Sequence, residues 1–345
     1  MINRNIIVIG ASTGGFEALQ SLVAGLSPSL PASIFVVWHM SPEVRGILPF
    51  VLNKCETLPA ANAYDGERFQ QGRIYVAPPD RHMIIEEAQL RISRGPKENR
   101  FRPAIDPLFR SAAFTYGKQV IGIILSGALD DGTAGLWMIK DFGGTAIVQH
   151  PRDAPVPSMP ESALREVAID YSIPVAEMPA LLHQLCTTPV SDTQQHKLMS
   201  LQEKNNIEQE IRVAGGDQSA GEQIRQFGEP TSYTCPECHG VLFALRDGKL
   251  TRYRCHTGHA FSSDSLLSAV TETVDDSLWN LIRGMEECIL LLNSTGDHHA
   301  AGNNPQLAAK YFQKAAEIVT RVKLLKEMAA SGEQLSRDQI DETQA

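Results

Sequence analysis

Residues 5–19 read Asn-Ile-Ile-Val-Ile-Gly-Ala-Ser-Thr-Gly-Gly-Phe-Glu-Ala-Leu, and this stretch decides the fold class. A run of β-branched apolar residues enters a glycine-rich turn, and apolar positions at helical spacing follow. The pattern predicts a buried strand, a tight loop and the start of a helix. Ser12 lies in this loop, where its hydroxyl would be exposed beside backbone N–H groups, as in a nucleophile elbow.

Two other interpretations of this loop compete with the nucleophile. Glycines at such a turn can bind a pyrophosphate, but Gly10, Gly14 and Gly15 do not complete the dinucleotide fingerprint. The next predicted strand also ends in His39 rather than in a ribose-binding acid. Ser12 as a simple N-cap of the following helix stays open at this point.

Composition narrows the class of protein. The 345 residues, 43% of them hydrophobic, are enough for two domains with at least one large core. A net charge of -9 without a long basic run argues against nucleic-acid binding. No stretch approaches the apolar length of a membrane span, and the N-terminus lacks a basic, apolar leader, so we expect a cytoplasmic protein without membrane insertion.

The strand, loop and helix pattern of the first residues recurs along the N-terminal half. Alternating strands and helices imply right-handed crossovers, so we predict an α/β fold with a doubly wound, mainly parallel sheet and helices on both faces. Ligands of such sheets bind beyond the C-terminal ends of the strands, where Ser12, His39 and Asp131 are expected. Besides the first, the predicted strands of this sheet are 33–38, 73–77, 119–125 and 144–149.

The character of the chain changes after Pro189. A polar stretch with at most one short helix, at 198–213, follows, and a cysteine cluster comes next. Two segments with apolar residues at helical spacing, 265–292 and 305–330, end the chain and are connected by residues 296–304. We therefore divide the chain into a catalytic domain (1–187), a polar linker (188–230), a zinc ribbon (231–264), a helical hairpin (265–331) and a frayed tail (332–345).

The first domain supplies the residue types that serine hydrolysis needs. A base must take the hydroxyl proton of Ser12, and an acid must hold the tautomer of that base. His39 and Asp131 fit these roles by their places after strands. His82 and His150 also follow strands and remain rivals for the base.

A set of motifs then points to a family. They are residues 9–15 (IGASTGG), 39–40 (HM), 77–82 (APPDRH), 102–113 (RPAIDPLFRSAA), and 125–127 (LSG) with 131–132 (DG). In this order, over about 185 residues, they resemble the catalytic domain of the chemotaxis protein-glutamate methylesterases, the CheB family. The resemblance implies hydrolysis of glutamate methyl esters on methylated chemoreceptor-like proteins, with release of methanol and a companion deamidation of glutamine.

The resemblance also assigns roles to residues. It implies that Ser12 is the nucleophile, His39 the base and Asp131 the orienting acid, with the neighbouring Asp130 as the alternative acid. It implies no cofactor for catalysis.

Two departures from the family pattern matter. Residues 126–129 read Ser-Gly-Ala-Leu where the family usually has Thr-Gly-Met-Gly, beside its oxyanion site, so substrate fit and rate depend on this loop. A non-catalytic interaction protein that retains the fold is therefore the alternative function.

Typical members also begin with a receiver domain, whereas this chain starts at the catalytic strand, so we expect no control by phosphorylation in cis.

The cysteine cluster has the spacing of a zinc site. Cys235 and Cys238 form a Cys-x2-Cys pair, and after sixteen intervening residues Cys255 and His259 form Cys-x3-His. Three thiolates and one imidazole suit tetrahedral Zn²⁺, and four protein ligands indicate a structural rather than a catalytic metal. His239 and His256 are substitute candidates.

The C-terminal helices carry more apolar residues than one hairpin buries against itself. Leu278, Leu281, Ile282, Ile289 and Leu292 are examples. We expect this surplus to serve docking on a partner or self-association, unless it packs on the rest of the chain.

Overall fold

The computed structural model describes residues 3–40, 47–190, 200–217, 219 and 223–330. The chain divides into two compact units, Met1–Leu266 and Leu267–Ala345. The tail that the sequence predicts to fray, 332–345, lies outside the described residues.

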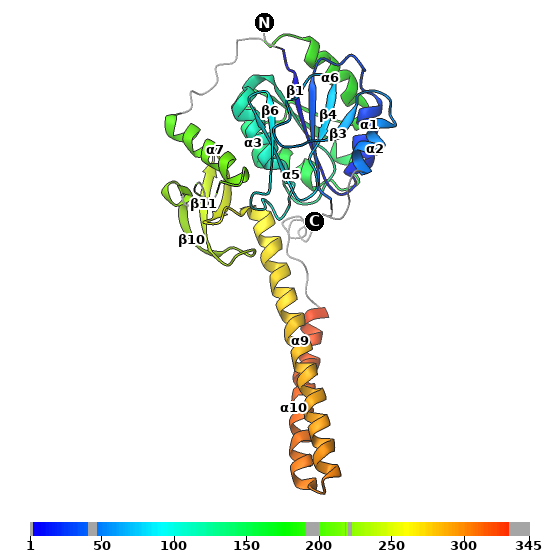
Figure 1. The fold of residues 1–345 in the computed structure, drawn as a ribbon, viewed down its shortest axis with the longest axis vertical. Helices are drawn as coiled ribbons and strands as arrows, with labels where there is room; N and C mark the ends of the chain where they lie inside the picture. The colour runs from blue at the N-terminus through cyan, green and yellow to red at the C-terminus, as the bar shows by residue number, and fades with distance from the viewer. Residues whose placement is uncertain (1–2, 41–46, 191–199, 218, 220–222, 331–345) are drawn as a thin grey trace. The chain divides into compact units, whose positions relative to one another are not determined.

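A seven-stranded sheet forms the centre of the first unit (Figure 1). Its strands run in the order β3-β4-β2-β1-β7-β8-β9, and every neighbouring pair is parallel. The prediction of a doubly wound parallel sheet is confirmed. The strands are β1 (Ile6–Ala11), β2 (Ser33–Trp38), β3 (Ala60–Asn62), β4 (Arg73–Val76), β7 (Val120–Ile124), β8 (Thr145–Gln149) and β9 (Tyr171–Ile173).

Helices cover both faces of this sheet. Successive side chains of β1 point to opposite faces, so that Ile7 and Ile9 belong to one core and Ile6 and Val8 to the other. The first core is closed by α1 (Gly15–Ala24), α2 (Ile47–Asn53) and α6 (Met178–Thr187). The second is closed by α3 (Ile105–Tyr116), α4 (Thr133–Asp141) and α5 (Ser158–Glu166).

The strand order reverses at β1. From β1 the chain crosses to β2 on one side, and later it returns to β7 on the other side. The loops that follow β1 and β7 therefore lie at the C-terminal edge of the sheet where the strand order reverses, which is the position at which α/β sheets bind ligands. Ser12 and Asp131 lie on these two loops, and His39 follows the neighbouring β2.

The polar segment 188–230, expected to be a linker with at most one short helix at 198–213, contains an α-helix close to those bounds among its described residues. Helix α7 (Leu201–Ala214) starts with a capping box between Ser200 and Glu203. Its Ile207 is buried in the core that α3 closes. The polar composition concealed this packing because only a narrow stripe of α7 is apolar.

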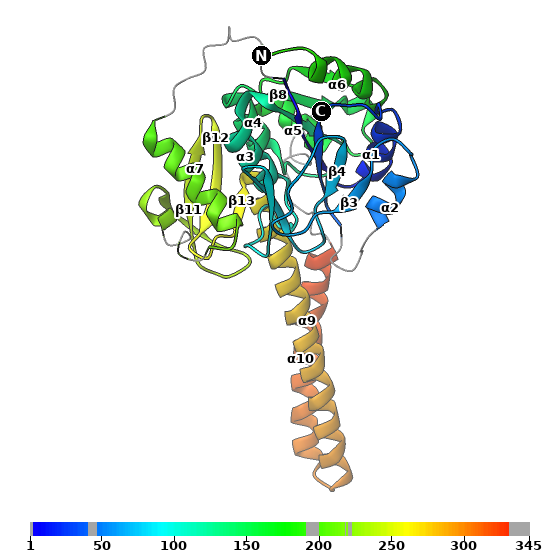
Figure 2. The ribbon, with the colours of Figure 1, turned by 45° about the horizontal axis from the view of Figure 1, so that its top comes forward.

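A four-stranded antiparallel sheet follows, and Figure 2 shows α7 beside its strands. Its order is β10-β11-β12-β13, with β10 (Glu229–Thr234), β11 (Val241–Asp247), β12 (Leu250–Cys255) and β13 (Ala260–Ser262). We call this sheet the ribbon. It belongs to the same compact unit as the seven-stranded sheet. A separate two-stranded hairpin is formed by β5 (His82–Glu86) and β6 (Gln89–Ser93).

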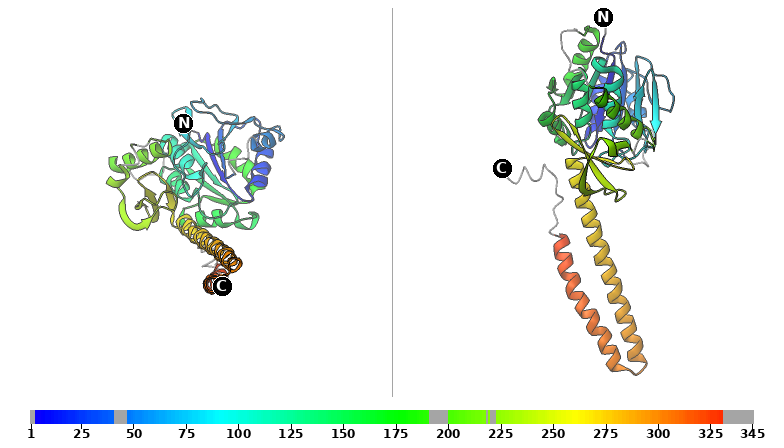
Figure 3. Two further views of the ribbon diagram at one scale, coloured as in Figure 1. Left: turned by 60° about the horizontal axis from the view of Figure 1, so that its bottom comes forward. Right: turned by 90° about the vertical axis from the view of Figure 1, so that its left-hand side faces the viewer.

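The second unit is a pair of long helices lying side by side (Figure 3). Helix α9 begins at Ser263 and continues to Ala301, and α10 spans Pro305–Ala330. Gly296, expected in the connection, lies inside α9, so the connection is shorter than the sequence suggested. Apolar side chains such as Val274, Leu290 and Leu324 are exposed. None of the described helices is long and apolar enough for a membrane span.

Candidate active site

Ser12 follows β1 directly and is almost fully buried. Its backbone N–H donates to the Ser126 carbonyl at 2.9 Å, which ties the loop after β1 to the loop after β7. The N-cap of α1 is Gly14, in the left-handed conformation with φ 72°, and not Ser12. The Ser12 hydroxyl therefore does not cap α1.

Gly127 shows how closely the two loops approach. A Cβ atom at this position would lie 2.7 Å from Ser12 Cβ and closer still to the sulfur of Met159. Only glycine allows this contact. The structure thus explains the glycine of the loop at residues 126–129 by the space that Ser12 occupies.

A hydrogen-bonded chain connects the serine, histidine and aspartate that the sequence singled out. His39 Nδ1 lies 3.1 Å from Ser12 Oγ, and His39 Nε2 lies 2.8 Å from Asp131 Oδ2. The side chains of His39 and Asp131 are 3% and 2% exposed, so water competes little for these contacts. Because Asp131 as a carboxylate only accepts, Nε2 carries the proton and Nδ1 is free to accept from the Ser12 hydroxyl.

The loop before α3, together with the first residue of that helix, holds two members of this chain, His39 and Asp131. The ring of Phe101 stacks on His39 with 3.7 Å between centroids and 9° between planes. The N–H of Ile105 donates to Asp131 Oδ2 at 2.7 Å, and the side-chain amide of Asn99 donates to Asp131 Oδ1 at 2.8 Å. These contacts fix the imidazole plane and the carboxylate orientation together.

The rival histidines have other partners. His82 is fully buried; its Nδ1 accepts from the Ala104 N–H at 3.3 Å, and its Nε2 donates to the Pro96 carbonyl at 2.9 Å. Burial lowers the pKa of His82, which keeps the ring neutral in this role. His150 accepts from the Arg152 N–H and so caps a short 3₁₀ turn.

The alternative acid, Asp130, also has a different hydrogen-bond partner from His39. Its Oδ1 accepts from the Ser262 hydroxyl at 2.7 Å. Desolvation, with a further contribution from the Asp264 carboxylate, raises the pKa of Asp130 to about 8. At neutral pH this group is therefore mostly protonated, whereas the acid that faces His39 is Asp131.

A further carboxyl lies behind Asp131. Burial, followed by the charge of Asp131, raises the pKa of Asp106 to about 7. Asp106 accepts from the Gly135 N–H at 2.7 Å and from Asn99 Nδ2 at 2.8 Å. Two acids thus share one amide donor, and the burial of a second full charge beside Asp131 is unfavourable.

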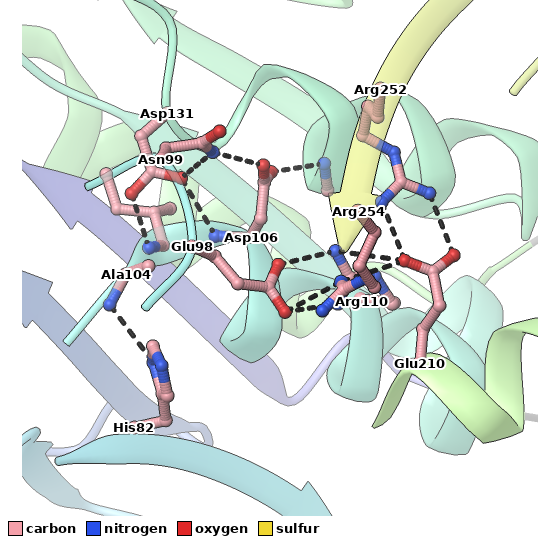
Figure 4. Close-up of polar contacts among 12 residues, drawn as sticks. His82, Glu98, Asn99, Ala104, Asp106, Arg110, Asp131, Glu210, Arg252 and Arg254 are labelled. Atoms are coloured by element: carbon pink, nitrogen blue, oxygen red, sulfur yellow. Dashed lines mark hydrogen bonds and ion pairs between the residues drawn. The ribbon is translucent and has the colours of Figure 1, made fainter. Parts of the chain in front are cut away.

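Buried charged side chains connect the ribbon to the loop before α3, which carries Glu98 and Asn99. The sequence analysis did not identify them. We call Glu98, Arg110, Glu210, Arg252 and Arg254 the ion-pair cluster; each is at most 4% exposed (Figure 4). Glu98 accepts from Arg110 at 2.9 Å and from Arg254 at 2.8 Å. Glu210 on α7 accepts from Arg252 at 2.7 Å and from Arg254 at 2.9 Å. The cluster therefore joins α3, α7 and β12 to the loop before the active site.

The four residues with metal-ligand spacing converge on one point of the ribbon. The ligand atoms of Cys235, Cys238, Cys255 and His259 all lie within 4.8 Å of one another. Cys238 Sγ is 3.6 Å from Cys255 Sγ, and His259 Nδ1 is 3.6 Å from Cys255 Sγ. A tetrahedron with Zn–S bonds of about 2.3 Å has edges of about 3.8 Å, so the residues fit Zn²⁺. Within the described residues, neither His239 nor His256 belongs to this cluster.

The fold and the site together define an α/β protein that places a serine, a histidine and an aspartate at the switch point of a doubly wound sheet. The sequence model of the CheB methylesterase family matches residues 7–182. The chain belongs to the CheB methylesterase family.

Individual relatives agree with this assignment. A protein-glutamate methylesterase/protein-glutamine glutaminase 2 from Anaeromyxobacter dehalogenans is 38% identical over 180 residues, which are 52% of this chain and 53% of that protein. The crystal structure of the Thermotoga maritima CheB methylesterase catalytic domain is 34% identical, covers 53% of this chain and 100% of that one, and superposes with a TM-score of 0.51. The chain spans about half the length of several curated relatives that it matches.

Proposed function

We propose that this protein is a serine hydrolase that demethylates glutamate methyl esters on chemoreceptor-like proteins, with a companion deamidation of glutamine. The observation that carries the proposal is the buried chain from Ser12 through His39 to Asp131. The names of the relatives, protein-glutamate methylesterase/protein-glutamine glutaminase, support the same substrate class.

The geometry supports a mechanism with balanced proton transfers. Ser12 Oγ attacks the ester carbonyl while His39 Nδ1 takes the hydroxyl proton, and Asp131 stabilises the resulting imidazolium. His39 then gives this proton to the departing methoxy oxygen, so that methanol leaves and an acyl-Ser12 remains. Water, deprotonated by His39, attacks the acyl group and releases the glutamate carboxylate and the free serine.

A methanol-release assay on a methylated receptor tests the proposal. Ser12→Ala should lower kcat on the order of 10⁴-fold or more, because one member of a hydrogen-bonded triad is lost. A purified wild type that releases no methanol from a methylated receptor and does not hydrolyse a small ester would favour the alternative, a non-catalytic interaction protein with this fold. Retention of more than a tenth of the activity in Ser12→Ala would contradict the serine mechanism.

For the ribbon we propose a structural Zn²⁺ held by Cys235, Cys238, Cys255 and His259. The metal would supply fixed geometry to turns that have little apolar core of their own. Metal analysis of the purified protein should find about one zinc per chain, and Cys238→Ser should lower this content. A metal-free wild type would contradict the site.

For the second unit we propose docking on a partner or self-association through its exposed apolar side chains, Leu290 and Leu324 among them. Analytical ultracentrifugation of the full chain separates the two. A concentration-dependent mass supports self-association, whereas a constant monomer mass leaves docking on the substrate protein as the proposal to test by pull-down. We also propose a cytoplasmic location, where such a substrate would present its methylated segment.

A further inference from the structure

Asn99 connects the hydrogen-bonded site to the ribbon. Its side-chain Nδ2 donates to Asp131 Oδ1 at 2.8 Å and to Asp106 Oδ2 at 2.8 Å (Figure 4). Asn99 is 4% exposed, and its φ of 49° lies in the left-handed region, which asparagine tolerates better than most residues. A buried amide in this conformation, with both protons on carboxyl groups, holds the rear oxygen of Asp131 in place.

The other side of the Asn99 amide is held by the segment at the end of the ribbon. Its Oδ1 accepts from the Ser262 N–H at 2.9 Å and from the Ser265 hydroxyl at 3.1 Å. A backbone N–H can only donate, so the oxygen of the amide must face Ser262 and the nitrogen must face the carboxyls. The ribbon thus determines which way the amide points.

Backbone pairing adds to this link. Asn99 N–H donates to the Ala260 carbonyl at 2.8 Å, and Ala260 N–H donates to the Lys97 carbonyl at 3.1 Å. Ala260 directly follows His259, one of the four residues of the metal-ligand cluster. The loop that carries Asn99 therefore forms an isolated parallel bridge with β13, between Glu98 and Ala260, one residue away from that cluster.

The ion-pair cluster holds the same loop through Glu98. Glu98, next to Asn99, accepts from Arg110 on α3 and from Arg254 on β12. Arg254 in turn directly precedes Cys255 of the metal-ligand cluster. Two of the residues that adjoin the metal-ligand cluster in sequence, Arg254 and Ala260, thus contact the loop that orients Asp131.

We propose that Asn99 is a positioning residue for Asp131, and that the ribbon sets its position, so that the order of the metal cluster controls turnover at Ser12. The route runs from His259 through residues 260–265 to Asn99, then to Asp131 and His39. This inference rests on the proposed function for its activity readout, while its structural readout is independent of it.

The first test is Asn99→Asp, measured on a small ester. This change keeps the size and the acceptors toward Ser262 but removes both amide donors. We expect kcat to fall about 10- to 100-fold with KM within about twofold, because misplacement of the triad carboxylate affects the transition state more than substrate binding. The loss relative to wild type should shrink at low pH, where a protonated Asp side chain can again donate to Asp131.

Asn53→Asp is the matched control. Asn53 also makes two amide hydrogen bonds, to the N–H and the carbonyl of Ala60, in the same unit but on α2. It should leave kcat within about twofold. An Asn99→Asp enzyme with kcat near that of wild type, or a loss that does not depend on pH, overturns the positioning role.

A second variant guards against a folding defect. Ser265→Ala removes one hydroxyl donor to Asn99 Oδ1, and we expect kcat to fall about 3- to 10-fold. Ser277→Ala, in which the lost hydroxyl donates to the Thr273 carbonyl of its own helix, should leave kcat unchanged. Equal rates for the two serine variants contradict control by the ribbon.

Hydrogen exchange supplies the readout that does not depend on esterase activity. Treatment of the full chain with a zinc chelator should accelerate amide exchange in peptides that cover residues 97–106, with peptides from β1 unchanged. If the wild type proves inactive on every ester, the proposed function fails, and this exchange experiment still decides the coupling. Unchanged exchange at 97–106 after verified metal loss overturns the inference.

Discussion

The first unit has two buried regions of opposite chemistry. The core around β1 is apolar, with every residue of Ile6–Ala11 buried, whereas the ion-pair cluster buries five charged side chains between the catalytic sheet and the ribbon. Asp247 also pairs with Arg252, so that the five cluster residues and Asp247 comprise three arginines and three carboxylates. Both regions are buried, but they contribute to the fold in different ways.

Apolar burial is favourable wherever it occurs, at about 25 cal/mol per Å², and it does not specify one orientation. A buried ion pair gains little net free energy because desolvation offsets the attraction, yet it is satisfied in only one arrangement. The β1 core thus accounts for stability, and the cluster accounts for how the ribbon meets the loop with Asn99. The predictions below test this division of roles.

The largest expected effect is on catalysis at the edge of the apolar core. His39→Gln should lower kcat about 10⁴-fold on a small ester, because no base then accepts the Ser12 proton. Steady-state kinetics measures it. His150→Gln is the control, since His150 caps a turn, and it should keep kcat within about twofold; a larger loss there than in His39→Gln would contradict the assignment of the base.

The next effect is on stability within the cluster. Glu98→Gln should reduce the free energy of unfolding by about 3–5 kcal/mol, because Arg110 and Arg254 keep buried charges without their partner. Urea titration at pH 7 measures it. The control is Glu237→Gln, which breaks a more exposed pair with Lys97 and should cost at most about 1 kcal/mol. Equal costs would remove the distinction between the cluster and the surface.

The pH dependence of stability should carry a signature of the cluster. Two arginines hold the pKa of Glu98 at about 2, below its ordinary 4.5, so the folded state binds fewer protons than the unfolded one in this range. Its stabilisation is complete above about pH 4.5 and is lost as the pH falls toward 2.

Asp106 has the opposite sign. Its pKa of about 7 lies above the ordinary 3.8, so its contribution becomes unfavourable as the pH rises from about 4 to 7. Urea unfolding between pH 3 and 8 should show an acid-side loss that Glu98→Gln reduces. An acid-side slope that this substitution leaves unchanged would contradict the role of Glu98.

The smallest effect is expected for Asp130→Asn. Asp130 has a pKa of about 8 and accepts from Ser262, a contact that asparagine can keep through its carbonyl oxygen. We expect kcat at pH 7 to stay within about twofold. Asp131→Asn, measured in parallel, should lose about 10⁴-fold because the tautomer of His39 is no longer held. A reversed order would make Asp130 the acid.

Local patterns of the sequence determined the five central strands of the sheet and the candidate site residues, but not the short edge strands β3 and β9. The apolar run before Ser12, the repeated strand and helix periods and the strand-end positions of His39 and Asp131 are all readable from neighbours along the chain. The spacing of Cys235, Cys238, Cys255 and His259 likewise depends on short intervals. These signals arise because backbone geometry and burial repeat every two or about 3.6 residues.

Only the tertiary structure decided how the ribbon meets the catalytic sheet. Glu98 and Arg254 are 156 positions apart, and Asn99 and Ser265 are 166 apart. Such pairs leave no periodic trace, because single polar residues within polar segments are typical of solvated surface as well. The same reason explains why α7 was expected in a linker. Its Glu210 is distinguished from its exposed neighbours only by the arginines that the fold brings to it.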